Sequence, residues 1–96
     1  MTDEKVLEIL KVISQPSRLE ILRRIRAQEN ESGVACSCVL QGMEISQSTF
    51  SHHIAELVQS GLVIGNSQGR FMYLSVDEKV WNEFQSALGK TVLGQT

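Results

Sequence analysis

The chain has 96 residues, the size of one small domain, and 42% of them are hydrophobic, a share typical of folded rather than disordered proteins. Its apolar runs are too short to span a membrane and it starts with an acidic segment unlike a secretion signal, so we expect a cytoplasmic protein without a membrane partner. The net charge is −2, but acidic residues gather towards both ends and arginines in the middle, which is compatible with a nucleic-acid partner for the central part.

Two helices are expected before residue 30. Thr2 suits the N-cap of the first helix, in which apolar residues recur at helical spacing. Gln15 and Pro16 end it, because the residue before a proline avoids the helical region, and Pro16 then suits the first turn of a second helix. The second helix carries four arginines, which are either phosphate contacts or a solvated face: Arg18, Arg23, Arg24 and Arg26.

A loop over residues 30–33 and a short third helix over about residues 35–41 are expected next. Cys36 and Cys38, the only two cysteines, lie at the start of this helix. Three interpretations stay open: an incomplete site for arsenite or a soft metal ion, a redox-sensitive thiol pair, or two small buried residues. Residues two apart on a helix point about 200° away from each other, so both thiolates would reach one ion only at a frayed helix end. No metal site is therefore assigned, and no cofactor is required.

A fourth helix is expected over residues 47–59. Ser46 has the side chain of an N-cap, and Gly61 suits the position just after the helix end. On a helical wheel one side of this segment is apolar and is expected to face the core. The core side comprises Phe50, Ile54, Leu57 and Val58, with His53 beside them as a packed, hydrogen-bonded histidine.

The opposite side of the fourth helix carries small hydroxyl, amide and imidazole groups, which suit base edges and phosphates in a DNA major groove. A three-residue turn precedes the helix, as in a helix-turn-helix motif. In the alternative interpretation, the hydroxyl groups only cap an ordinary surface helix. The residues predicted to contact DNA are Gln47, Ser48, Thr49, Ser51 and His52, of which His52 is the best placed.

A β-hairpin and a last helix complete the chain. Residues 62–64 and 71–76 have strand character and flank a turn-rich segment over residues 66–69. Arg70, the one charged residue of the hairpin, is predicted to contact phosphate or the minor groove, the alternative being a solvated turn arginine. Asp77 suits the N-cap of the last helix. The expected fold is mainly α with a β-hairpin, a winged helix-turn-helix in the order α-α-α-α-β-β-α, as a single domain over residues 1–96.

The first and last helices carry more apolar surface than two terminal helices of a small domain readily hide, which predicts a homodimer. The alternative is that both apolar stripes complete the core of the monomer. The predicted dimer-interface residues are Val6, Leu10, Ile13, Trp81, Phe84 and Leu88.

Several segments together resemble the ArsR–SmtB family of winged-helix repressors: residues 14–22 (SQPSRLEIL), 45–54 (ISQSTFSHHI), 60–63 (SGLV) and 69–74 (GRFMYL). The resemblance implies a homodimer built from the first and last helices, which binds a two-fold symmetric double-stranded DNA operator and is released by an inducing signal. Family members that sense arsenite or soft metals often carry Cys-x-Cys near the start of the third helix. Here those two positions fall on Ala35 and Ser37, and a third cysteine ligand is missing.

We therefore expect a sequence-specific DNA-binding repressor and not an enzyme, because no nucleophile–base set, carboxylate pair or phosphate-binding loop stands at a convincing place. The inducing signal would be thiol-directed if Cys36 and Cys38 take part in it. The rival hypothesis is a winged-helix protein-interaction module that does not bind DNA, which the small positive charge of the exposed helix face favours.

Overall fold

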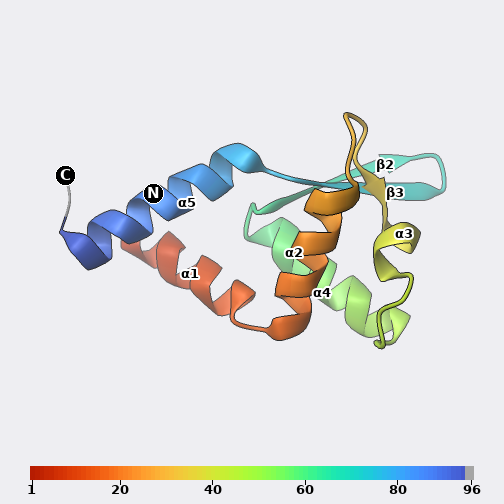
Figure 1. Cartoon of the computed structure of the whole chain (residues 1–96), viewed down its shortest axis with the longest axis horizontal. Helices are drawn as coiled ribbons and strands as arrows, with labels where there is room; N and C mark the ends of the chain where they lie inside the picture. The colour runs from red at the N-terminus through yellow and green to blue at the C-terminus, as the bar shows by residue number, and fades with distance from the viewer. Residues whose placement is uncertain (95–96) are drawn as a thin grey trace.

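The computed structural model describes residues 1–94 and confirms a mainly helical fold with an antiparallel hairpin. Figure 1 shows α1 and α5 side by side at one end of the molecule, and α3 with the tip of the hairpin at the other. No helix within residues 1–94 is long and apolar enough to cross a membrane. The elements are α1 (Asp3–Ile13), α2 (Pro16–Gln28), β1 (Val34–Ala35), α3 (Cys36–Leu40), α4 (Gln47–Gln59), β2 (Val63–Gln68), β3 (Phe71–Val76) and α5 (Glu78–Leu93).

The helices begin at the residues whose side chains replace the missing hydrogen-bond acceptors of a first turn. Thr2 Oγ1 accepts from the backbone N–H of Lys5 at 3.1 Å, and Asp77 Oδ1 accepts from that of Val80 at 3.3 Å. Ser46 caps α4 in the same way. All three predicted N-caps are confirmed, so the start of α4 is fixed by its own sequence.

The sheet contains one strand more than the sequence predicted. β1 pairs antiparallel with β3, and the strand order is β1-β3-β2. Ala35, expected in the third helix, is instead the last residue of β1, and α3 begins at Cys36. A strand of two residues is too short to show the alternation by which strands are recognised, which explains the omission. β1 ties the start of α3 to the middle of the hairpin.

The hairpin is longer and its turn tighter than predicted. β2 runs to Gln68, which pairs with Phe71, so the connection consists of Gly69 and Arg70. Gly69 has φ +64°, a left-handed conformation that two-residue hairpin turns require and glycine adopts without strain. The predicted turn over residues 66–69 is therefore displaced, and Arg70 stands at the very tip of the wing.

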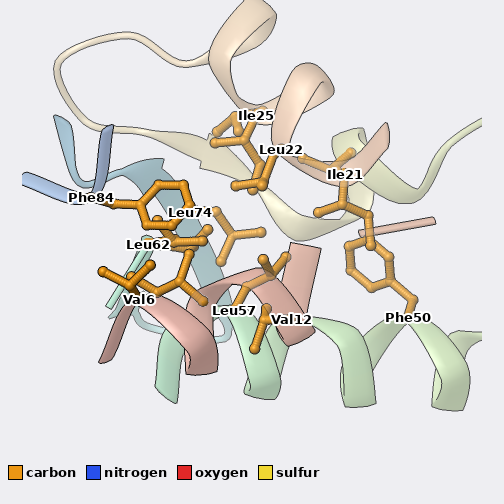
Figure 2. Packing of buried hydrophobic residues seen from close by; sticks show 14 residues of the cluster. Val6, Val12, Ile21, Leu22, Ile25, Phe50, Leu57, Leu62, Leu74 and Phe84 are labelled. Atoms are coloured by element: carbon orange, nitrogen blue, oxygen red, sulfur yellow. The ribbon is translucent and has the colours of Figure 1, made fainter. Parts of the chain in front are cut away.

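The core draws on every helix and on the sheet. Figure 2 shows Leu57 of α4, Leu62 and Leu74 of the hairpin region, and Phe84 of α5 in one cluster with side chains from α1 and α2. Val6 and Phe84, predicted for a dimer interface, are each only 3% exposed within this single chain. Both belong to the core of the protomer, as the alternative interpretation of the terminal helices held for them.

Candidate nucleic-acid interface

Helix α4 has a buried and an exposed side. Phe50, His53 and Leu57 are buried, while Ile54 is half-buried. Val58, predicted for the core, is 40% exposed. It lies over β2, because a Cβ added to Gly65 would be 3.7 Å from Val58 Cγ2. It stands at the edge of the apolar stripe, where the hairpin leaves it partly uncovered. The predicted DNA-contacting side chains are all exposed: Gln47, Ser48, Thr49, Ser51 and His52.

The hydroxyl groups at the start of α4 form a small network. Ser46 Oγ accepts from the backbone N–H of Thr49 at 3.1 Å and donates to Thr49 Oγ1 at 2.9 Å. Ser48 Oγ lies 3.2 Å from Ser46 Oγ. Ser48 and Thr49 thus take part in capping, as the alternative interpretation proposed. A hydroxyl group has both donor and acceptor capacity, so these side chains also remain able to bind a phosphate at the helix N-terminus.

His53 is held in place by an arginine from α2. Arg18 Nε donates to His53 Nδ1 at 3.0 Å, and Arg18 Nη1 donates to the carbonyl oxygen of Val12 at 3.3 Å. His53 is therefore the packed, hydrogen-bonded histidine that was predicted. Its partner was not foreseen: Arg18 is half-buried, and its two hydrogen bonds connect α1, α2 and α4.

Burial lowers the pKa of His53, and the positive charge of Arg18 and the neighbouring His52 lower it further. The imidazole is neutral in this arrangement, because Nδ1 accepts the hydrogen bond from Arg18. Protonation would remove the acceptor and bring two positive charges together in a buried position.

We expect acid to destabilise the protein through His53. As the pH falls below about 6.5, the ordinary histidine pKa, the unfolded chain binds a proton that folded His53 does not, so the free energy of unfolding decreases until its lower folded-state pKa is passed. Urea unfolding at pH 7.5 and pH 5.0 measures this difference. His53→Gln should shrink it, whereas His52→Gln should retain most of it, because His52 is the smallest of the three causes that lower the pKa of His53. An equal pH dependence in all three proteins would contradict the assignment.

The other arginines of α2 bind the protein's own oxygen atoms. Arg24 Nη1 donates to the carbonyl oxygens of Gln41 at 2.7 Å and Val39 at 3.3 Å, and so holds the end of α3. Arg23 pairs with Glu20, and Arg26 with Glu29 and Glu78. Each of these arginines thus has an acceptor within the protein, although the side chains of Arg23 and Arg26 remain 72% and 59% exposed.

Arg70 differs from these arginines. It is exposed at the tip of the hairpin, and within residues 1–94 it has no carboxylate partner. Together with Gln47 and Ser51 of α4 it lines a cleft between α3, α4 and the hairpin. The structure thus brings together three of the six predicted DNA contacts, while Ser48, Thr49 and His52 lie outside this cleft.

The two cysteines lie on the wall of the same cleft, in the first turn of α3. Both are free thiols; Cys36 is half-buried against the core and Cys38 is exposed. Burial raises the pKa of the Cys36 thiol, so the thiolate is disfavoured there. No group of three or more histidine, cysteine or acidic residues that could hold a metal ion occurs within residues 1–94.

The layer formed by α1 and α5 retains apolar surface even though Val6 and Phe84 are buried in the core. Of the predicted interface residues, Leu10, Ile13, Trp81 and Leu88 are only half-buried. Leu7, Val92 and Leu93, which the prediction did not include, are 58%, 70% and 67% exposed. The two helices that carry this surface lie at the end of the molecule opposite the hairpin tip (Figure 1).

Comparisons with known proteins agree with this geometry. Residues 13–65 match a family described as a helix-turn-helix domain. The arsenical resistance operon repressor of Staphylococcus xylosus is 40% identical over 75 residues, which are 76% of this chain and 67% of that protein.

Solved structures share the fold at lower identity. An ArsR-like transcriptional regulator from Rhodococcus sp. RHA1 superposes with a TM-score of 0.80 at 18% identity, covering 95% of this chain and 82% of that one. The homodimeric winged helix-turn-helix DNA-binding domain of a possible ArsR-family regulator from Mycobacterium bovis gives a TM-score of 0.71 at 20% identity, covering 99% and 94%.

Proposed function

Because the chain belongs to the ArsR–SmtB family of winged-helix transcriptional regulators, we propose that it is a homodimeric repressor that binds a two-fold symmetric DNA operator. Two copies of α4 enter major grooves about one helical turn apart, and each hairpin follows the adjacent backbone. Gln47, Ser51 and His52 read base edges, while Ser48 and Thr49 contact phosphate at the helix start.

The observation that carries this proposal is the exposed polar side of α4 beside the guanidinium of Arg70, which has no carboxylate partner within the described part of the chain. The buried side of the helix is fixed by Phe50, His53 and Leu57, so its polar side chains stand outward on a rigid support. The staphylococcal relative is a repressor by name. A protein-interaction module would not require a wing tip that carries an exposed positive charge.

Selection of bound sequences from a random duplex library tests the proposal. We expect a palindromic site whose affinity decreases linearly on a log–log plot as salt concentration rises, because bound cations are released from each contacted phosphate. Failure to enrich any sequence, or binding that does not change with salt, would favour the interaction module.

His52→Ala is expected to weaken binding to the selected operator by about 1–3 kcal/mol, because the exposed imidazole would lose a base contact. Fluorescence anisotropy with labelled operator measures the change. Asn82→Ala provides the control, since Asn82 is exposed on α5. Equal affinities of the His52→Ala variant and the wild type would remove His52 from the base-reading set.

The inducing signal is proposed to be thiol-directed: arsenite, a soft metal ion or an oxidant acting at Cys36 and Cys38. Relatives named as arsenical resistance operon repressors support this proposal. α3 has no side-chain cap at its start, so a rearrangement of its first turn around two thiolates would break no capping hydrogen bond. Cys38 would react first, because Cys36 is half-buried and its pKa is raised.

Titration of the operator complex with arsenite, cadmium and a mild oxidant tests the thiol proposal. We expect release of the wild-type protein and retention of a Cys36→Ser/Cys38→Ser variant on the DNA. Release of both proteins by the same agent would show that the signal acts elsewhere.

A further inference from the structure

The cleft between α3, α4 and the hairpin has a volume of about 1170 Å³, enough for a small organic ligand. One wall is formed by Cys36 and Leu40 of α3, and the floor by Phe50 and Ile54 of α4. Val58 continues the floor towards the hairpin, whose Phe71 and Met72 close the other side. The cleft is therefore lined largely by carbon and sulfur, directly beside the proposed DNA-contacting surface.

Three of its lining side chains are unusually exposed for their size. Phe71 is 59% exposed, and Val58 and Met72 are each 40% exposed. Val58 and Met72 adjoin, because a Cβ on Gly65 would lie within 4 Å of both. Moving clustered apolar side chains out of water lowers the free energy, so such a patch gains from being covered. On a small protein an exposed apolar patch commonly marks a binding surface.

The charge of the cleft restricts the ligand further. Among the lining residues that the structure describes, Arg70 is the only charged one, and none carries a carboxylate. A cationic ligand would meet a like charge, whereas a carboxylate would form a bidentate, charge-assisted pair with the guanidinium. We propose that the cleft binds a hydrophobic monocarboxylate, with its apolar body against Val58, Phe71 and Met72 and its carboxylate on Arg70.

Such a ligand would compete with DNA, and this consequence rests on the proposed function. Gln47, Ser51 and Arg70 line the cleft and are also proposed DNA contacts. A carboxylate on Arg70 neutralises the wing tip, and the apolar body occupies the space between recognition helix and wing. Ligand and operator then weaken each other's binding by the same factor.

Three probes with one ring system and different charges test the site on the full chain without DNA. These are 1-naphthoate, 1-naphthalenemethanol and 1-naphthylmethylammonium, titrated by calorimetry and by backbone amide NMR. We expect 1-naphthoate to bind about tenfold more tightly than the neutral probe, as one charge-assisted pair provides. Amide shifts should fall on α3, α4 and the hairpin. Equal affinities for the three probes, or shifts confined to α1 and α5, would overturn the proposal.

Variants separate the two parts of the site. Arg70→Gln should reduce the affinity for 1-naphthoate to that of the neutral probe, and Val58→Gln should weaken both probes. Ile64→Gln is the matched control, because Ile64 is 48% exposed on β2 but does not line the cleft. An equal loss of affinity in Ile64→Gln would overturn the assignment. An affinity for 1-naphthoate that falls as the protein concentration rises would also overturn the assignment, because a second copy of the chain would then occupy the cleft.

Competition is measured separately, as the apparent Kd of the selected operator with and without 1-naphthoate. We expect 1-naphthoate to raise this Kd for the wild type and to have a smaller effect on Val58→Gln. Absence of operator binding without 1-naphthoate would refute the proposed function and leave the ligand titration standing. Bound 1-naphthoate that leaves operator affinity unchanged would instead refute the competition.

Discussion

Leu57→Ala is expected to lower the free energy of unfolding by about 2–5 kcal/mol. Leu57 is fully buried on the inner side of α4, and Figure 2 shows it in the cluster that joins α4 to the other helices. Truncation removes apolar contacts and leaves a cavity that the surrounding side chains fill only in part. Because small domains have a total stability of about 5–15 kcal/mol, a loss of this size is a large fraction of it.

Urea unfolding followed by circular dichroism measures this loss, with Val58→Ala as the control on the same helix. Val58 is 40% exposed, so its truncation should change stability by no more than about 0.5 kcal/mol. A similar loss in both variants would mean that the buried side of α4 is assigned wrongly. The rigid presentation of the polar side of α4 would then lose its support.

The helices were predictable because single residues determine where they begin and end. Ser46 and Asp77 cap helices through their own side chains, and Gly61 adopts φ +88° just after the end of α4. Such interactions involve neighbours in sequence, so they depend little on the tertiary fold. The exposed side of α4 followed from the same local periodicity.

The features that the sequence did not reveal depend on contacts between distant segments. β1 forms because residues 34 and 35 pair with β3, some forty positions later in the chain; Val34, for example, pairs with Leu74. The hydrogen bond from Arg18 to His53 likewise joins two helices. Val58 was misplaced because a helical wheel gives the direction of a side chain but not whether another element covers it. The cleft beside Val58 was not predicted for the same reason: it forms between α3, α4 and the hairpin, and a helical wheel of α4 alone does not show it.

The same reasoning explains the terminal helices. Val6 and Phe84 share the apolar stripes of α1 and α5 with Leu10 and Leu88, yet only the first two are buried within the protomer. A stripe shows that apolar side chains face one way, but the distance to the next helix decides which of them a single chain covers. The residues left half-buried are those on which the dimer proposal now depends.

Leu88→Glu is expected to convert the dimer into monomers and to lower operator affinity by about 10²–10⁴-fold, because a dimer gains the second half-site as an intramolecular contact. Leu88 is half-buried on α5, as Leu10 and Trp81 of the predicted interface are, and a carboxylate would have no partner in an apolar interface. Analytical ultracentrifugation gives the oligomeric state, and fluorescence anisotropy gives the operator affinity.

The control is Ser86→Glu, which adds the same charge at an exposed position on the other side of α5 and should leave both quantities unchanged. Circular dichroism establishes that each variant is folded. If Leu88→Glu does not fold, Val92→Glu carries the test, because Val92 is 70% exposed one helical turn further along and does not support the protomer core. A folded variant that stays dimeric with full operator affinity would place the dimer interface away from α5, since a buried unpaired carboxylate at this position is incompatible with tight apolar packing.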